Sequence, residues 1–333
     1  MNDIWHFLRE FESKELMKRY IKNRYDFSLN TSKAIEITSA FSQGREYFFN
    51  SNEADISVRP LLQYYGVVAL SRGLILILNK AARENNIIPS HGMKINNWDE
   101  VNKSGKIEDV IVKTSSGTFT ELINVTENKS YFRAGSSGIN WHVTYDKPPT
   151  ESEIKLGEIA MSFPDLVLST KSWLNQEIPS RNMNSLKILD NKIEMKIQGK
   201  KESNILDKLF PIEIFKNLEI EEKGHECIVK FDSDSMPNFS QKWVSAFQVI
   251  GDPCINPPLK YNVFLNDLAK MYCVSFVFGT ISRYYPSAWN NIHKGINNDS
   301  VLPFALNFMD FMKEKYPQVI MDFLKGPYDF ENK

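Results

Sequence analysis

The chain has 333 residues, of which 42% are hydrophobic and 24% charged, a composition typical of a globular protein rather than a disordered or fibrous one. Its 40 basic and 41 acidic residues leave a formal net charge of −1, which excludes the overall basic excess of non-specific nucleic-acid binders. The three widely spaced cysteines form no Cys-x-x-Cys pair, so we expect no metal site and no cofactor.

The sequence predicts neither secretion nor membrane insertion. Its first segment, Met1–His6, carries an early acid and no apolar core. Apolar stretches such as Gly73–Leu78 and Val274–Gly279 are far shorter than the ~20 residues that span a bilayer. We therefore expect a cytoplasmic protein with no membrane contact.

Residues 1–90 have helical periodicity. Apolar residues recur every three or four positions over Trp5–Tyr25, and a second helix is expected from Thr31 or Ser32, whose hydroxyl groups can cap free backbone N–H groups. A third helix is expected over Arg59–Ala82, with a proline in its first turn. It is apolar on nearly every face, so it should lie at the centre of the protein.

Residues 91–255 are predicted to form a mixed insertion. The segments Asp109–Lys113 and Thr118–Leu122 are short, rich in β-forming residues and separated by a turn, which predicts a hairpin. Alternation around Ile193–Ile197 predicts a further small antiparallel sheet. Between them, Glu151–Trp173 is expected to be an interrupted helix.

Residues 256–326 return to helical periodicity. We expect one long helix within Val263–Ser282 and an amphipathic helix over Pro303–Leu324, followed by a loose tail at 327–333. The predicted fold class is α+β and mainly α. A helical core from both ends of the chain would carry a central α/β insertion with small antiparallel sheets.

One motif at the end of an apolar run combines a guanidinium, aromatic rings and a helix-stopping proline. The candidate ligand-binding residues of this corner are Arg283, Tyr284, Tyr285 and Trp289. A guanidinium fork can bind an anion, and aromatic rings can stack on a nucleobase. The alternative is a helix end at which Arg283 donates to backbone carbonyls and the rings pack.

Several arginines lie in apolar helices, where a charge is costly unless it is paired. The candidates for a shared internal anion site are Arg45, Arg59, Tyr64, Tyr65 and Arg72. The alternative is structural ion pairing, for which Glu46 and Glu53 are the nearest partners in sequence.

His91 follows a predicted helix end. It can act as an acid or base near neutral pH, or it can cap the carbonyl groups of that helix. No nucleophile stands beside it. The catalytic candidates are His91, Arg83 and Arg283.

Four segments, in this order, resemble the bacterial YaaC-like family. They are Gly44–Phe48, Arg59–Gly66 with Ser71–Ile75, His91-Gly92, and Ser282–Pro286 with Trp289. The resemblance implies a shared fold and a bacterial cytosolic setting. It implies no reaction and no catalytic residues.

The amino-terminal part also resembles the HEPN helical class, which includes RNases, toxins and phage-defence proteins. HEPN ribonucleases place Arg and His four to six residues apart on one helix. Here seven residues separate Arg83 from His91, and nine separate Arg283 from His293. This departure counts against RNase activity through the usual motif.

Three functions remain open from the sequence. The leading hypothesis is a binding component that recognises a protein or nucleotide-like partner, in a phage-defence or stress system. The first alternative is a HEPN-like effector that cleaves RNA without a metal. The second is a structural subunit, with Phe304, Phe308 and Phe311 at its interface, although packing inside one chain is the favoured use of these rings. A protein partner or a homodimer, and a nucleotide or nucleic acid, are the expected partners.

Overall fold

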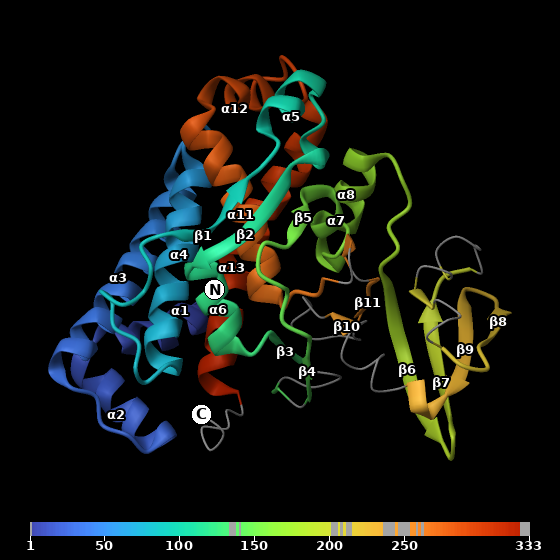
Figure 1. Ribbon diagram of the computed structural model, residues 1–333, viewed down its shortest axis with the longest axis horizontal. Coiled ribbons are helices and arrows are strands. Elements are labelled where there is room, and N and C mark those ends of the chain that lie inside the picture. Colours follow the sequence, from blue (N-terminus) through green and yellow to red (C-terminus); the bar gives the residue numbers. More distant parts are fainter. Residues whose placement is uncertain are drawn as a thin grey trace. The chain divides into compact units, whose positions relative to one another are not determined.

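The computed structural model describes most of the chain (Figure 1). The described residues are 2–132, 138–139, 141–200, 206, 209–210, 215–235, 244–245, 254–257, 259–260 and 263–326. The predicted loose tail at 327–333 lies outside them. The chain divides into two compact units. Unit 1 comprises Met1–Glu127, Pro149–Gly157 and Leu268–Lys333, and unit 2 comprises Asn128–Pro148 and Glu158–Asp267.

Unit 1 begins with a run of helices. These helices are α1 (Asn2–Arg9), α2 (Lys14–Tyr25), α3 (Thr31–Glu53) and α4 (Arg59–Leu78), with the short 3-10 helix η1 (Glu10–Glu12) between the first two. Ser13 accepts a hydrogen bond from the Leu16 N–H at the start of α2. Asn30, rather than the predicted Thr31 or Ser32, accepts from the Lys33 N–H at the start of α3, because the capping side chain must precede the first helical residue.

Helix α4 lies in the core of unit 1, as its all-round apolar sequence predicted. It packs closely on α3 because glycines, which have no side chain, lie at the contact between the two helices. A Cβ at Gly44 would lie 2.6 Å from the Leu70 side chain, and one at Gly66 would lie 2.7 Å from the Phe48 ring. By length and composition α4 could also cross a membrane, contrary to the sequence expectation. However, 72% of its apolar window is buried inside the protein, which is the behaviour of a core helix.

The carboxy-terminal helices pack with the amino-terminal ones. They are α11 (Asp267–Tyr284), α12 (Pro286–His293) and α13 (Leu302–Lys325). The Gln63 side chain of α4 donates to the Met309 carbonyl of α13 at 2.7 Å, and the Ser71 and Tyr316 hydroxyls lie 2.6 Å apart. In Figure 1 the blue and the orange-to-red helices lie together in this unit. Both ends of the chain therefore build one helical body.

Unit 1 also contains a small antiparallel sheet. Its strands are β1 (His91–Ile95), β2 (Ile111–Gly117) and β5 (Glu153–Lys155), in the order β1-β2-β5. Helix α5 (Trp98–Ser104) connects the first two strands, and α6 (Thr118–Thr126) packs on α4. Unit 1 consequently continues past residue 90, because these elements rest on its helices.

The prediction of a strand over Thr118–Leu122 was wrong, because these residues begin helix α6. Gly117, with a φ of +143°, ends β2 directly before them, in a backbone region that few other residues adopt. The buried positions Phe119, Leu122 and Ile123 then follow helical spacing. A short apolar run cannot be assigned from alternation alone.

Unit 2 is built on an antiparallel sheet. The strand order is β10-β11-β6-β7-β9-β8. Its strands are β6 (Arg181–Leu189), β7 (Lys192–Gln198), β8 (Glu219–Lys223), β9 (Glu226–Asp232), β10 (Val244–Ser245) and β11 (Cys254–Ile255). Unit 2 also contains a two-stranded ribbon of β3 (Lys129–Phe132) and β4 (Trp141–Thr144). Its helices include α8 (Val167–Leu174) and most of α7 (Leu156–Ala160), which begins in unit 1.

In unit 2, buried and less buried side chains alternate along strands such as β7, and the buried ones form the core. On β7 the side chains of Ile193, Met195 and Ile197 are buried, and Met195 pairs with the equally buried Val229 of β9. Figure 1 shows β6, β7 and β9 side by side. The predicted fold class, α+β and mainly α with small antiparallel sheets, is confirmed.

Candidate functional site

Helices α4 and α11 approach closely in unit 1, and the approach brings their aromatic residues together. On α11, Tyr272, Phe276, Gly279 and Arg283 recur at helical spacing and share one face. A Cβ at Gly279 would lie 2.8 Å from the Tyr64 Cβ of α4. Only glycine fits there without moving one of the helices.

The Tyr64 ring is enclosed by aromatic side chains. It lies edge-on to Tyr272 with ring centroids 5.8 Å apart, 5.8 Å from Phe276 and 5.3 Å from His91. Only 3% of Tyr64 is exposed, and burial raises the pKa of its hydroxyl. The nearby Tyr272 hydroxyl donates to the His91 carbonyl instead. The buried Tyr64 hydroxyl thus has no hydrogen-bond partner among the described residues.

His91 lies at the start of β1, half-buried against the same rings. Its carbonyl accepts a hydrogen bond of 3.3 Å from the Tyr272 hydroxyl. Burial, and then the positive charges of Arg283 and Arg72, hold the pKa of His91 below its usual value. The imidazole is therefore neutral near pH 7.

Arg72 and Arg283 both place positive charge near His91. Arg283 donates to the Tyr65 hydroxyl and lies 4.8 Å from the Tyr284 ring centroid. Within the described part of the chain neither arginine forms an ion pair with a carboxylate. The Arg72 Nε is buried without an acceptor.

We call these side chains the arginine–tyrosine cluster. Its members are Tyr64, Tyr65, Arg72, His91, Tyr272 and Arg283. A buried guanidinium N–H and a buried phenol without partners are costly. An anion that accepted from both would remove that cost, because guanidinium groups bind carboxylate and phosphate oxygens strongly.

A family model for the YaaC-like proteins matches residues 9–324. The chain belongs to the YaaC-like family. A search of curated proteins and a search of solved structures each found no match. The family resemblance seen in the sequence is therefore confirmed, whereas nothing in these comparisons supports the HEPN resemblance.

Two other predicted arginines of this YaaC-like protein form ion pairs. Arg45 binds Glu12 at 2.7 Å and Glu46 at 2.8 Å, so its expected neighbour Glu46 is one of two partners. Arg59 binds Asp310 of α13. The Arg59 Nε is nevertheless buried without an acceptor. The structure does not bring either arginine into the arginine–tyrosine cluster.

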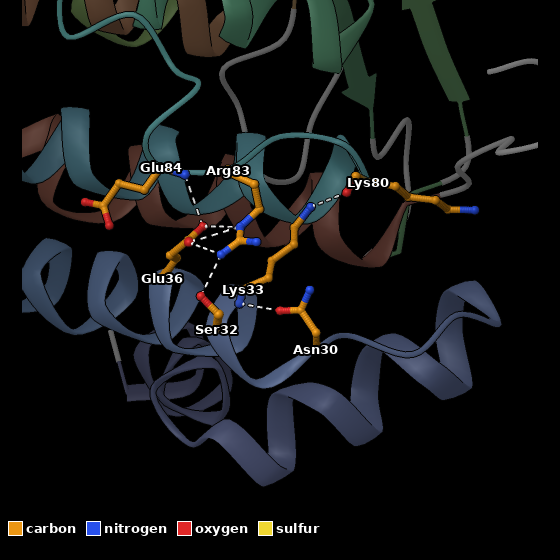
Figure 2. Close-up of polar contacts among 7 residues, drawn as sticks. All are labelled: Asn30, Ser32, Lys33, Glu36, Lys80, Arg83 and Glu84. Atoms are coloured by element: carbon orange, nitrogen blue, oxygen red, sulfur yellow. Dashed lines mark hydrogen bonds and ion pairs between the residues drawn. The ribbon is translucent and has the colours of Figure 1, made fainter.

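Arg83 is held in a separate network, which Figure 2 shows. Its guanidinium donates to both carboxylate oxygens of Glu36, at 2.6 to 3.1 Å, and to the Ser32 hydroxyl at 2.6 Å. Glu36 also accepts from the Glu84 N–H. The charges that act on His91 do not include Arg83. Arg83 thus ties the segment after α4 to α3.

The aromatic corner after α11 divides into two kinds of residue. Trp289 is 1% exposed, and its indole N–H donates to the Ile56 carbonyl at 2.8 Å. Tyr285 stacks on Trp98 with ring centroids 4.2 Å apart. These two rings pack, as the helix-end alternative proposed. Tyr284 is 59% exposed, and it lies beside Arg283 at the surface.

The carboxy-terminal phenylalanines pack inside unit 1. Phe304 and Phe308 are buried, and their ring centroids lie 6.3 and 6.2 Å from that of Phe278. Phe304 and Phe308 therefore do not form an exposed interface.

Sequence reasoning missed the contribution of α11 to the cluster. Tyr272, Phe276 and Gly279 precede Arg283 at steps of four, three and four residues. That spacing could have placed them on one face. It could not have shown that the face meets Tyr64.

Potential metal ligands are dispersed. Among the described residues, no group of three or more His, Cys, Asp or Glu side chains could hold a metal ion. The three cysteines are buried.

Proposed function

We propose that this YaaC-like protein binds a phosphate-bearing, nucleotide-like anion at the arginine–tyrosine cluster. The observation that carries the proposal is the convergence of Arg72 and Arg283 on His91 without a carboxylate partner in the described part of the chain. The unpartnered Arg72 Nε and Tyr64 hydroxyl lie in the same cluster. Both can donate to phosphate oxygens.

The exposed Tyr284 ring favours a nucleotide over a simple inorganic anion. Arg283 already lies against this ring, so a phosphate bound to the guanidinium would bring an attached base within reach of an aromatic face. Stacking of a base on an aromatic side chain contributes about 1–3 kcal/mol. We therefore expect nucleotides to bind more tightly than phosphate alone.

Calorimetric titration with ATP, GTP, AMP and inorganic phosphate tests the proposal. The variants Arg72→Gln and Arg283→Gln should each weaken nucleotide binding at least about tenfold, the usual loss for a charge-assisted hydrogen bond to a bound anion. The matched control is Arg45→Gln, because Arg45 is already paired with Glu12. Equal affinity in all four proteins would overturn the proposal.

Metal-independent RNA cleavage is the second candidate. A neutral imidazole beside two guanidinium groups suits a general base next to a phosphodiester, with the positive charges stabilising the developing negative charge. Labelled RNA should then be cleaved in EDTA by the native protein and not by His91→Ala. The absence of cleavage, or cleavage that survives His91→Ala, removes this candidate.

We also propose a cytoplasmic location, which suits a chain whose three cysteines are few, widely spaced and buried. A role in phage defence or stress, with a protein partner or a second copy of the chain, remains our prediction. Light scattering of the purified protein tests self-association directly. A monomer at high concentration would contradict the homodimer.

A further inference from the structure

Unit 2 contains a cavity that lies outside the arginine–tyrosine cluster. Its volume is about 480 Å³, which is within the range of small-molecule sites. The lining residues come from η3 (Pro164–Leu166) and α8, from the segment before β6, and from the facing ends of β6 and β7.

The cavity has an apolar wall. Pro164, Val167, Leu168 and Ile178 contribute side chains to it. Leu168 is 80% exposed, the largest exposure recorded for a large apolar side chain in the described residues. An apolar ligand group covering Leu168 would remove that surface from water, which is favourable in proportion to the area covered.

Most of the other lining residues are polar, and several of them are positively charged. Arg181 and Asn182 begin β6, and Lys200 follows the end of β7. Lys171 is paired with Glu177, so its charge is compensated. Neither Arg181 nor Lys200 forms an ion pair in the part of the chain that the structure describes. The charge of Arg181 does act on the Glu177 carboxylate, which also lines the cavity and is paired with Lys171.

Arg181 is held in a fixed orientation. Its Nη1 donates to the carbonyls of Ile178 at 2.6 Å and Ser180 at 2.9 Å, and this leaves the edge formed by Nε and Nη2 for another acceptor. Gly199 flanks this edge, since a Cβ there would lie 3.0 Å from Nε. The buried Ser180 hydroxyl, without a partner among the described residues, lines the same cavity.

We propose that this cavity binds a small organic carboxylate with an apolar body. The planar edge of Arg181 would hold the carboxylate through two parallel hydrogen bonds. Lys200 would add charge, and the Ser180 hydroxyl can donate to the same oxygens. The apolar body would lie against Val167 and Leu168. A small, strongly hydrated anion would leave this apolar wall uncovered, so the anionic group alone does not satisfy the cavity.

The test uses sodium octanoate as the probe, titrated into the full-length protein in a calorimeter. We expect saturable binding of octanoate, no measurable binding of 1-octanol, and weaker binding of octyl phosphate. Arg181→Gln should weaken octanoate binding at least about tenfold, the loss expected for a bidentate charged contact. Leu168→Ser should weaken it several-fold.

The controls separate recognition from folding. Lys187→Gln changes an exposed residue of β6 outside the cavity and should bind octanoate as the native protein does. If Arg181→Gln does not fold, Lys200→Gln is the variant that tests the proposal, because Lys200 forms no ion pair within the described residues. Lys200→Gln should weaken octanoate binding several-fold. The proposal is overturned if octanoate does not bind, if 1-octanol or octyl phosphate binds as well as octanoate, or if Arg181→Gln and Lys200→Gln bind it unchanged.

Discussion

Two regions of unit 1 use arginine in opposite ways. Where α3 meets the end of α4, Arg83 is paired with Glu36 and the positive charge is compensated. Where α4 meets α11, Arg72 and Arg283 lie near a half-buried histidine without a carboxylate within the described residues. The ion pair in the first region should stabilise the folded protein. The unpaired groups in the second region should lower its stability and leave hydrogen-bond donors for a ligand. Strained or unsatisfied groups are often retained where a ligand satisfies them.

The largest effect is expected for the close contact that builds the second region. Gly279→Ala should lower the free energy of unfolding by about 2–3 kcal/mol, because the new Cβ would meet the rigid Cβ of Tyr64. Urea unfolding measures the loss. Gly73→Ala is the matched control and should cost less, since its Cβ would meet the edge of the Phe41 ring, which can shift. Equal losses would show that α11 can move away from α4.

A smaller effect separates the two regions directly. Glu36→Gln should lower the free energy of unfolding more than Arg72→Gln does, because Arg83 loses its charged acceptor. Water replaces part of that interaction, since Arg83 is partly exposed. Arg72→Gln should change the free energy of unfolding by less than about 0.5 kcal/mol. Chemical unfolding of both variants provides the comparison. A large loss in Arg72→Gln would mean that Arg72 serves folding rather than binding.

The pKa of His91 reports the charge of the cluster. Removing the charge of Arg283 in Arg283→Gln should raise the pKa of His91 toward its usual value, because one positive neighbour is lost. Titration of the His91 ring signals by NMR measures this, with Arg45→Gln as the control that should leave it unchanged. An unaltered pKa in Arg283→Gln would place that charge outside the cluster.

The same titration predicts how binding depends on pH. A bound anion stabilises the protonated imidazole, so nucleotide affinity should rise as the pH falls through the pKa of His91. His91→Ala should remove this dependence. A pH dependence that survives in His91→Ala would assign it to another group, such as the ligand phosphate.

A separate pH-dependent effect is expected at Lys33, in the compensated region. Lys33 donates to the carbonyls of Asn79 and Lys80 at the end of α4 (Figure 2 shows the second), and burial lowers its pKa to about 8. The unfolded chain binds this proton more tightly, so stability should rise from pH 8 toward pH 10.

The check on Lys33 is unfolding of the native protein and Lys33→Met across this pH range. The rise should be absent in Lys33→Met and retained in Lys22→Met, which changes an exposed lysine. A parallel rise in all three proteins would assign the titration elsewhere.

Local pattern was enough for most elements but not for all. The long helices were predicted because their apolar residues recur over several turns, as in α4 and α13. The strand predicted over Thr118–Leu122 failed because five residues carry too little periodicity. The cavity of unit 2 had no sequence signal, since its walls come from segments around Leu168, Arg181 and Gly199 that meet only after folding.

The sequence by itself determined the helical core, the small sheets, the family and the set of arginines and tyrosines from which a site could be built. Only the tertiary structure decided which arginines are compensated. Arg45 finds Glu12, and Arg59 finds Asp310 more than half the chain away, whereas Arg72 and Arg283 find no acid among the described residues. The physical reason is that helical spacing is local, but ion pairing depends on which helix faces come into contact.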